Sequence, residues 1–480
     1  MDSGYSISLI FISDIQNTLE MNSEVYKKNI TSLKITIIGL RKSGYAAALL
    51  GYELGANIFV SELNNDPEII SNKNKLIKKN ILVETGKHSD LVYKADFWVI
   101  SPGVPNDIEI VNKATKLNIP IIGEIEFASR FTKLPIIAVT GSNGKSTTVN
   151  ILYSMLKNGE FNPILAGNIG TPLSEKVKEE LKNPKLGDIY ILEISSFQLE
   201  FIDQFKPMIS LYLNISPDHL DRHRSMREYI EMKLKMIENH DISDTVIYNI
   251  DDSVLRSSFN NYKMKKVPFS ILEKTPYFRV NEKNIYDDNE NPFVFIDDII
   301  LKGKHNLSNM LASATVAKIM NVDDVIIKNT MKNFKGIVHR LQIIDKINQV
   351  TYINDSKATN IQSVIVAINS FNNPIILLLG GKNKNSDFRL LLPHIKRHVK
   401  HIVSYGEAGG EIAAAIGDAV RLNCVSSLNQ AVASAHNLAN PGDIVLMSPG
   451  CASFDQFKNF EERGEKFIEL VNDMKVKECD

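Results

Sequence analysis

One short stretch, AVTGSNGKSTT at residues 138–148, constrains the fold of this chain more than any other. The apolar, β-branched run before it predicts a strand, and the run STTVNILYSMLKNG that begins within it predicts a helix. A glycine-rich turn between a strand and a helix is the setting of a phosphate-binding loop, in which backbone N–H groups and the helix N-terminus face an anion. The stretch therefore predicts a nucleotide site at the edge of an α/β domain.

The loop departs from the commonest phosphate-loop pattern, which would place a glycine where Val139 stands. Its glycines are Gly141 and Gly144, so it is either a shorter nucleotide loop or a chance cluster of small residues. Lys145 can neutralise phosphate charge, and Ser146 can offer a hydroxyl to Mg²⁺. A plain glycine turn has no need of Lys-Ser-Thr at a helix start, so nucleotide binding is the favoured interpretation.

Acidic and imidazole side chains follow two later strands of the same block. Glu193 ends a strand within 188–200, where it could reach Mg²⁺ or orient a water, or be an ordinary strand-end glutamate. His219 and His223 have the spacing of two zinc ligands on one helix face. A zinc hydrolase would need glutamate directly after the first histidine, and Leu220 stands there, which argues against zinc hydrolysis.

The first block of the chain predicts a doubly wound sheet. A strand at 34–40, a helix that ends at Gly55 and a strand at 57–62 form a βαβ unit, and 96–105 is a further strand. A dinucleotide fingerprint would need glycine at position 41, and Arg41 stands there, which argues against a dinucleotide site. Two interpretations of this turn remain: it binds a phosphate ligand in another way, or it is purely structural.

The rest of the chain predicts a small antiparallel sheet and then another α/β domain. Residues 264–300 alternate polar and apolar positions between turn signals, and 302–320 is a helix with Asn306 and Asn309 near its start. From about residue 338, strands alternate with helices, and polar clusters follow the strands.

Length and composition limit the alternatives. A chain of 480 residues is too long for one core. We expect three domains: 1–132 (with an extension at 1–32), 133–337 and 338–480. A net charge of −1 argues against nucleic-acid or anionic-lipid binding, and three scattered cysteines fit a reducing cytoplasm. No run of residues is long and apolar enough to span a bilayer. The N-terminal stretch lacks the basic residues and the cleavage site of a signal peptide, and Met21 could be the true start. We expect a monomer.

At this point the motifs carry a resemblance. TGSNGKSTT, EISSFQLE, NISPDHLDRH, HNLSN, VHR, NDSKATN, LLGGKNKNSDF and SPGCASFDQFKNFEERGEKF occur in the order seen in Mur ligases, over roughly 33–470. The last four are similar to the branch of the family that adds D-glutamate. In this family the shorter glycine loop is usual, which answers the question raised by Val139.

The resemblance implies a fold and a reaction. The fold would have an N-terminal Rossmann-like domain, a central P-loop ATPase α/β domain with a small antiparallel sheet, and a C-terminal Rossmann-like α/β domain. The reaction would join D-glutamate to UDP-N-acetylmuramoyl-L-alanine through an acyl phosphate, with ATP as co-substrate and Mg²⁺ at two sites. Such a ligase acts in the cytoplasm in peptidoglycan precursor synthesis, and so in cell-wall biogenesis, cell shape and cell division.

The resemblance also assigns residues. The catalytic set that it implies is Lys145, Glu193, His219 and Lys233, with Lys233 carbamylated, and the metal set is Ser146, Glu193, His219 and Lys233. The ATP-binding set is Gly141, Ser142, Asn143, Gly144, Lys145, Ser146, Thr147, Asn309, Arg340, Asp355 and Lys357. The substrate-binding set is Ser43, Glu62, Ser101, Pro102, Gly103, Asn168, Ser195, Thr359, Lys384, Ser453, Phe454 and Phe460, of which Thr359, Lys384, Ser453 and Phe460 would hold D-glutamate.

Two points stay open in the sequence. Spacing alone would make Lys233 a solvated helix lysine. Arg41 and Lys42 replace the small or apolar residues that are usual in the family, so they could contact the pyrophosphate or merely be solvated. Rival functions are a sister ligase or a folylpolyglutamate synthase, a P-loop switch or motor ATPase, and a non-catalytic UDP-sugar binder.

Overall fold

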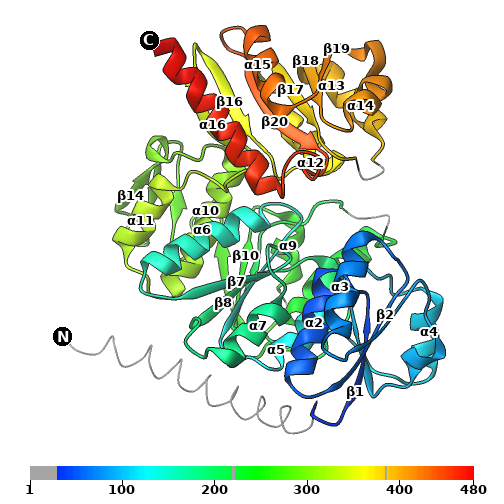
Figure 1. Cartoon of the computed structure of the whole chain (residues 1–480). Coiled ribbons are helices and arrows are strands. Elements are labelled where there is room, and N and C mark those ends of the chain that lie inside the picture. Colours follow the sequence, from blue (N-terminus) through cyan, green and yellow to red (C-terminus); the bar gives the residue numbers. More distant parts are fainter. Residues whose placement is uncertain (1–29, 219–221, 261, 384–385, 480) are drawn as a thin grey trace. The chain divides into compact units, whose positions relative to one another are not determined.

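The computed structural model describes residues 30–218, 222–260, 262–383 and 386–479 (Figure 1). The chain divides into two compact units, Met1–Phe334 and Lys335–Asp480. Most of the predicted N-terminal extension, with Met21, lies outside the described residues. The mixed α/β fold class predicted from the sequence is confirmed.

The first unit opens with a parallel sheet of strand order β3-β2-β1-β4-β5. Its strands are β1 (Lys34–Ile38), β2 (Asn57–Glu62), β3 (Leu82–Thr85), β4 (Phe97–Ile100) and β5 (Ile121–Gly123). The helices between them are α2 (Lys42–Glu53), α3 (Pro67–Ile77), η1 (Asp90–Tyr93), α4 (Glu109–Lys116) and α5 (Glu124–Ser129). Strand order reverses between β1 and β4, so a ligand site is expected at the carboxyl ends of these two strands.

A second parallel sheet follows, of order β11-β10-β9-β6-β8-β7. Its strands are β6 (Ile136–Thr140), β7 (Pro163–Gly167), β8 (Ile189–Glu193), β9 (Ile209–Tyr212), β10 (Thr245–Asn249) and β11 (Lys265–Phe269). Its helices are α6 (Lys145–Asn158), α7 (Leu173–Lys182), η2 (Ser196–Leu199), α8 (Met226–Leu234), η3 (Lys235–Ile237), α9 (Ser253–Ser258), α10 (Lys304–Ile319) and α11 (Asp324–Asn333). The run IIAVT is buried at every position, as expected of a central parallel strand.

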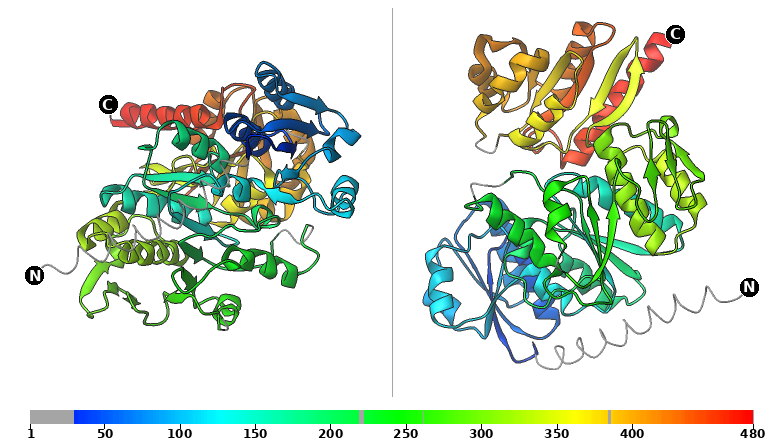
Figure 2. Two further views of the ribbon diagram at one scale, coloured as in Figure 1. Left: turned by 90° about the horizontal axis from the view of Figure 1, so that it is seen from below. Right: turned by 180° about the vertical axis from the view of Figure 1, so that it is seen from behind.

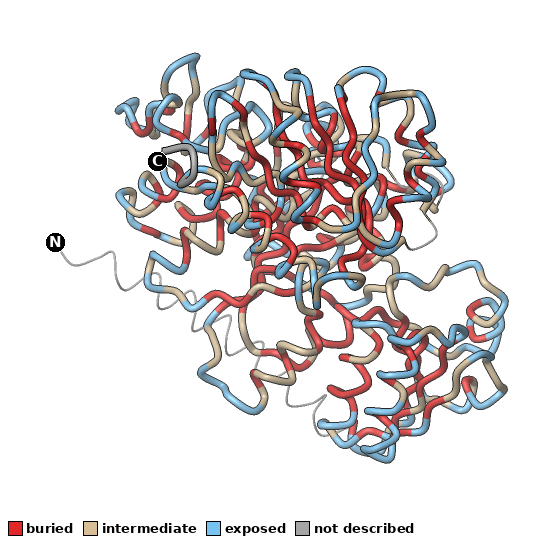
Figure 3. The backbone as a smooth tube through the Cα atoms, turned by 45° about the horizontal axis from the view of Figure 1, so that its top comes forward, coloured by how far each residue is buried: buried red, intermediate tan, exposed pale blue. Residues whose placement is uncertain are grey.

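The two sheets of the first unit share helices and a core. Helix α7, which connects β7 and β8 of the second sheet, packs against α2 and α5, which accompany the first sheet. Figure 1 shows the three helices together. One cluster of buried side chains runs from residue 30 to residue 264 and includes members of both sheets. Figure 3 shows the buried stretches in the interior of the fold.

The predicted small antiparallel sheet is present but shorter than expected. It is formed by β12 (Arg279–Val280), β13 (Asn284–Tyr286) and β14 (Pro292–Phe295), with η4 (Ile296–Asp298) after it. It belongs to the yellow-green region with α10 and α11, and β14 contacts α11 (Figures 1 and 2). The prediction was wrong for 265–269, because β11 pairs in parallel with β10. As an edge strand, β11 buries only Val267 and Phe269, on one side. Its sequence therefore alternates between apolar and polar residues, as that of an antiparallel strand also does.

The second unit is a six-stranded mixed sheet of order β15-β16-β20-β17-β18-β19. Its strands are β15 (Gln342–Ile347), β16 (Val350–Asn354), β17 (Ile375–Gly380), β18 (Val399–Tyr405), β19 (Arg421–Val425) and β20 (Ile444–Gly450). Its helices are α12 (Ile361–Asn369), η5 (Phe388–Leu391), α13 (Leu392–His398), α14 (Gly409–Ile416), η6 (Gly417–Ala419), α15 (Leu428–Leu438) and α16 (Phe460–Cys479). Only the β15–β16 pair is antiparallel among the strands described in this unit, so the carboxyl ends of β16, β20 and β17 meet at one edge.

Candidate functional site

The glycine loop lies at the carboxyl end of β6, in the middle of the second sheet. Gly144 has a φ of +87°, and a Cβ added to it would lie 2.4 Å from Oδ1 of Asn309. Only glycine combines this backbone conformation with so close a neighbour. Asn309, on α10, is buried and lies against the loop.

Two lysines converge on one carbonyl of this loop. Nζ of Lys145 donates to the carbonyl oxygens of Gly141 and Ser142 at 2.7 Å and 3.0 Å. Nζ of Lys233, which comes from α8, donates to the same Gly141 oxygen at 3.1 Å. Two lysine side chains thus meet at one loop carbonyl, and the positive charge that they bring there favours a polyphosphate.

Lys233 is buried, with a relative exposure of 1%. Burial first, and repulsion from Lys145 second, lower its pKa to about 7, while Asp218 acts in the opposite direction. Its Nζ also lies 4.7 Å from the centre of the Tyr229 ring. The interpretation of Lys233 as a solvated helix lysine, which spacing alone favoured, is therefore wrong.

Glu193 ends β8 next to the loop and is 3% exposed. Ser146 donates its hydroxyl to one carboxylate oxygen at 2.7 Å, and the side-chain amide of Asn168 donates to the other at 2.8 Å. The backbone N–H of Asn168 also donates to the backbone oxygen of Glu193, at 2.8 Å. The predicted neighbours of the phosphate loop are thus brought together.

The donor set fits Mg²⁺. A buried carboxylate and a serine hydroxyl in contact with each other supply oxygen ligands, which Mg²⁺ prefers. Among the described residues, which leave out 219–221, no group of three or more His, Cys, Asp or Glu side chains could hold a metal ion. From the part of the chain that the structure describes, a magnesium ion here would draw its ligands from this carboxylate and hydroxyl, and phosphate or water oxygens could complete the set.

Contacts that the sequence did not predict hold the loop in place. The hydroxyl of Ser142 lies 3.0 Å from that of Tyr229, and it donates to the backbone oxygen of Ser216 at 2.9 Å. Asn143 and Asn214 exchange two hydrogen bonds, from the Asn143 N–H at 2.8 Å and from the Asn214 side-chain amide at 3.0 Å. Tyr229 stands four residues before Lys233 on one helix, a spacing that could have identified it.

The remaining predicted residues of this sheet are placed as follows. Thr147 lies in the first turn of α6, and Ser195 is the N-cap of η2, where its N–H and hydroxyl both donate to the Gln198 side-chain oxygen. His219 lies outside the described residues.

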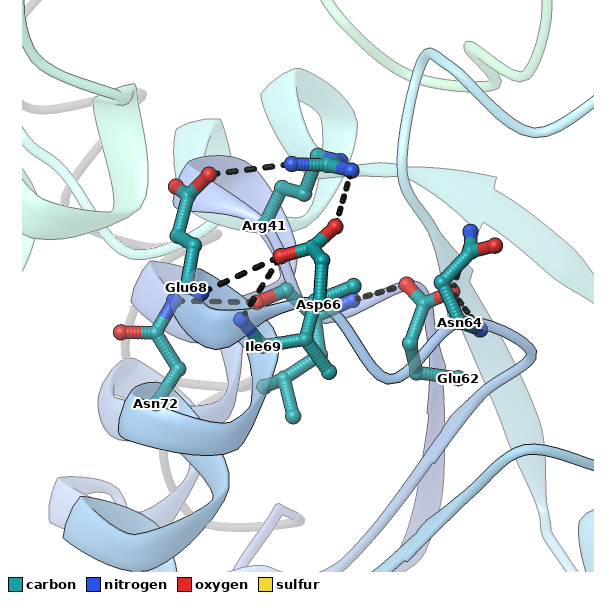
Figure 4. Close-up of polar contacts among 8 residues, drawn as sticks. Arg41, Glu62, Asn64, Asp66, Glu68, Ile69 and Asn72 are labelled. Carbon is teal, nitrogen blue, oxygen red and sulfur yellow. Dashed lines mark hydrogen bonds and ion pairs between the residues drawn. The ribbon is translucent and has the colours of Figure 1, made fainter.

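The carboxyl edge of the first sheet carries the second group of predicted residues. Glu62 is buried, and its carboxylate accepts the N–H of Leu40 at 2.9 Å and that of Asn64 at 2.8 Å (Figure 4). The side-chain amide of Asn72 donates to the Leu40 oxygen at 3.1 Å. Glu62 and Asn72 therefore connect the turn after β1 to the segment after β2.

Arg41 occupies the same turn. Its guanidinium forms ion pairs with Asp66, which caps α3, and with Glu68 (Figure 4). Two carboxylates thus form ion pairs with Arg41. Lys42 is exposed, and among the described residues it forms no ion pair. Of the two cations that could contact a pyrophosphate, Lys42 is the one not already paired.

The loop after β4 packs closely on this turn. A Cβ added to Gly39 would lie 2.7 Å from the Ser101 hydroxyl oxygen, and one added to Gly44 would lie 2.9 Å from it. Gly39 has a φ of +95°. Ser43, in the first turn of α2, and Pro102 and Gly103 are on the same two segments. The structure thus brings the predicted UDP-site residues together at the switch point between β1 and β4.

The second unit places its predicted residues at the edge shared by β16, β20 and β17. Asp355, directly after β16, is 4% exposed, and burial raises its pKa to about 6. Ser448 donates its hydroxyl to the Asp355 carboxylate at 2.7 Å, and the Leu341 N–H donates to it at 3.2 Å. His339 and Leu341 have φ values of +62° and +43°, so the turn that carries exposed Arg340 is strained.

The other residues of this group surround the same edge. Lys357 and Thr359 lie in the loop after β16, Ser453 is buried after β20, Phe454 is 63% exposed, and Phe460 begins α16. Lys384 lies outside the described residues.

Arg463 was not predicted, and it joins the two loops of this edge. It is fully buried on α16, and it donates to the backbone oxygens of Ser356 at 2.8 Å and Cys451 at 3.1 Å, and to the Ser356 hydroxyl at 3.0 Å. Nothing in the charged run FEERGEK marks this arginine as the buried one.

Family profiles match both units. The profile of the Mur ligase middle domain matches residues 139–317, and that of the Mur ligase glutamate ligase domain matches residues 339–451. A UDP-N-acetylmuramoylalanine–D-glutamate ligase of Christiangramia forsetii is 37% identical over 457 residues, which cover 92% of this chain and 99% of the relative. One of Bacillus cytotoxicus is 38% identical over 445 residues, which cover 91% and 97%.

Solved structures share the fold at low identity. UDP-N-acetylmuramate–alanine ligase from Thermotoga maritima has a TM-score of 0.52 at 17% identity, and the alignment covers 92% of this chain and 100% of that one. MurF ligase from the same organism, in complex with ADP, has a TM-score of 0.51 at 15% identity, with 88% and 96% covered.

Proposed function

The chain belongs to the Mur ligase family, and within it to the UDP-N-acetylmuramoylalanine–D-glutamate ligases; on this premise we propose that it joins D-glutamate to UDP-N-acetylmuramoyl-L-alanine and cleaves ATP. The product is a precursor of peptidoglycan, so the reaction serves cell-wall biogenesis, cell shape and cell division. The observation that carries the proposal is the convergence of Lys145 and Lys233 on Gly141 beside buried Glu193.

The reaction begins with a carboxylate, which is a poor electrophile. A carboxylate oxygen of the L-alanyl group attacks the γ-phosphorus of ATP, the bond to ADP breaks, and an acyl phosphate forms. The D-glutamate nitrogen then attacks the acyl carbon and loses a proton, and phosphate leaves with one oxygen of the original carboxylate. Negative charge gathers on the transferred phosphoryl group, where preorganised cations stabilise it most.

Lys145 is the residue that we expect to contact the β- and γ-phosphates. In the described structure its ammonium bonds to loop carbonyls, so a bound nucleotide would take over these contacts. The loop N–H groups, the N-terminus of α6 and Asn309 complete the nucleotide site. From the second unit, Arg340, Asp355 and Lys357 are proposed to contact the nucleotide.

Ser146 and Glu193 are the residues that would hold a magnesium ion, together with His219. When bound, Mg²⁺ would neutralise phosphate charge and orient the phosphates. We propose that the Lys233 nitrogen forms a bond to the carbon of CO₂ and loses a proton to solvent, so that the resulting carbamate anion could support a second ion. A neutral amine is required for that reaction, and the burial and lowered pKa of Lys233 favour it.

The acceptor amino acid is proposed to bind in the second unit. D-glutamate would be held by Thr359, Lys384, Ser453 and Phe460, with Phe454 beside them. Lys384 is suited to this role because a lysine ammonium can form an ion pair with the γ-carboxylate of D-glutamate. The UDP moiety is proposed to bind at Ser43, Glu62 and Ser101–Gly103, and Asn168 and Ser195 would contact the rest of the donor.

Further points stay proposals. No helix among the described residues is long and apolar enough to cross a membrane. We propose a cytoplasmic location, because ATP and UDP-linked sugars are made there. We also propose that the protein is a monomer and that it divides into domains 1–132, 133–337 and 338–480.

An isotope experiment tests the acyl phosphate. The donor carboxylate is labelled with ¹⁸O, and the inorganic phosphate released during turnover is analysed by mass spectrometry. Ligation through an acyl phosphate transfers one labelled oxygen to phosphate. A switch or motor ATPase uses water as the nucleophile, so unlabelled phosphate would contradict the proposal.

A further inference from the structure

Arg222 connects the loop after β4 to the segment after β8. One of its terminal nitrogens, Nη2, donates to the backbone oxygen of Val104 at 2.9 Å and to Oε2 of Glu200 at 2.8 Å. Val104 directly follows Ser101–Gly103, which belong to the proposed UDP site, and Glu200 directly follows η2. A single guanidinium therefore joins the substrate loop of the first sheet to the nucleotide side of the second.

The connection is partly buried. The side chain of Arg222 is 19% exposed and that of Glu200 is 6% exposed, and the guanidinium carbon lies 5.2 Å from the centre of the Phe197 ring. Removing the cation would leave the Glu200 carboxylate buried without this partner, which is more costly than losing a surface ion pair. Arginine suits this position because its rigid planar group can serve several contacts at once.

The contacts continue from Arg222 to the phosphate loop. The His223 ring stacks on Phe197 with centres 5.5 Å apart, and its Nε2 lies 2.9 Å from the Ser196 hydroxyl. The same ring lies 5.2 Å from that of Tyr229, whose hydroxyl is 3.0 Å from that of Ser142 in the loop. An unbroken series of described side chains thus links Val104 to the phosphate loop.

We propose that Arg222 is a positioning residue, which fixes the loop that binds the UDP-linked donor relative to the loop that binds ATP. The inference rests on the proposed function, in which an oxygen of the donor must approach the γ-phosphorus of ATP in line. A misplacement of about 1 Å can cost roughly a hundredfold in rate. The donor is held at the first sheet and ATP at the second, so a fixed connection between the two loops sets that distance.

The test compares Arg222→Met and Arg222→Lys with Arg224→Met. Arg224 is a matched control on the same segment. Its side chain is 78% exposed, and the distance from its guanidinium to the Asp107 carboxylate is 3.9 Å. For Arg222→Met we expect about a tenfold higher KM for UDP-N-acetylmuramoyl-L-alanine and about a tenfold lower kcat, while the KM for ATP changes less than about twofold. Arg222→Lys should recover part of the loss, and Arg224→Met should match the wild type.

A residue that only stabilised the fold would lower the melting temperature and leave the KM values of the folded enzyme unchanged. Wild-type kinetics in Arg222→Met, or an equal rise in both KM values, would overturn the inference. Calorimetric binding of the same UDP-linked donor, measured without ATP, separates this failure from failure of the proposed function. A wild type that binds the donor about tenfold more tightly than Arg222→Met supports the positioning role even without turnover. Equal binding by the two proteins contradicts the positioning role alone, and no binding by the wild type contradicts the proposed function and the positioning role with it.

Discussion

At the scale of single residues, Lys145 is the side chain most directly tied to the chemistry. Lys145→Ala should lower kcat by roughly 10²–10³-fold or more, because it removes a cation from the charge that develops on the phosphoryl group. Circular dichroism and the melting temperature should stay close to the wild type, since Lys145 is partly exposed and its ammonium donates to two carbonyl oxygens of the loop that carries it. Lys157→Ala, near the end of the same helix, is the control. Near-normal turnover in a folded Lys145→Ala protein would remove the phosphate-loop interpretation.

Lys233 is the residue at which the sequence and the structure differ most. The spacing of charges in YIEMKLKMIENH cannot tell which lysine of the helix points inward, so the sequence alone favoured a solvated one. The structure buries Lys233 under the phosphate loop, because the loop carbonyl of Gly141 and the ring of Tyr229 accept its ammonium there. The loop residues themselves were predictable, since a strand, two glycines and Lys-Ser follow a simple local rule.

Lys233→Ala should be nearly inactive, because it removes both the buried amine and the proposed carbamate. Adding a short carboxylic acid such as formate or acetate in excess should restore part of the activity by supplying the missing anion. Arg227→Ala, whose side chain is 87% exposed on the same helix, should behave as the wild type with or without the acid. Full activity of Lys233→Ala, or no trace of rescue, would contradict the carbamate.

At the scale of elements, a glutamate on one helix stabilises the start of another. Glu124 on α5 is 1% exposed and accepts the N–H of Ser174, in the first turn of α7, at 2.6 Å. Its other carboxylate oxygen and the Ser174 hydroxyl are buried without a hydrogen-bond partner among the described residues. Burial raises the pKa of Glu124 to about 6 from its ordinary value of 4.5, and the hydrogen bond from the Ser174 N–H opposes this rise.

The raised pKa predicts how stability depends on pH. Between pH 4.5 and about 6 the folded chain keeps a proton on Glu124 that the unfolded chain has lost, so this group makes unfolding easier as pH rises through that window. Glu124→Gln carries no charge to bury, so at pH 7 it should be more stable than the wild type by about 2 kcal/mol, and the gain should vanish below pH 4.5. Urea unfolding at pH 4, 5, 6 and 7 measures this, with Glu179→Gln, at a partly exposed position of α7, as the control. A pH-independent difference would show that the charge is not the cause.

Element types were predictable where the hydrophobic period was long or the run was fully buried, as in IIAVT of β6 and the helix after it. Edge strands were not, because one-sided burial gives β11 the alternation that an antiparallel strand also has. Tertiary contacts such as those of Arg222 and Arg463 join segments far apart in the chain, and no local pattern encodes them.

At the scale of the whole molecule, the second unit should fold alone. Two clusters of buried side chains lie entirely within residues 335–480, whereas the cluster of the first sheet continues into the second sheet. A fragment of residues 335–480 should therefore unfold in one cooperative transition, and a fragment that ends at residue 132 should not, because α2 and α5 would lose α7. A disordered 335–480 fragment would contradict the prediction, and a cooperative fragment ending at 132 would favour three folding units.

The central claim, a ligase that adds D-glutamate, is tested most directly by the amino-acid dependence of ADP release. The purified chain is given ATP, Mg²⁺ and UDP-N-acetylmuramoyl-L-alanine, alone or with D-glutamate, L-glutamate, L-alanine or a diamino acid, and ADP and the UDP-linked product are quantified together. We predict sustained ADP release only with D-glutamate, with one ligated product formed for each ADP. ADP release at the same rate without any amino acid, or a preference for another amino acid, would contradict it.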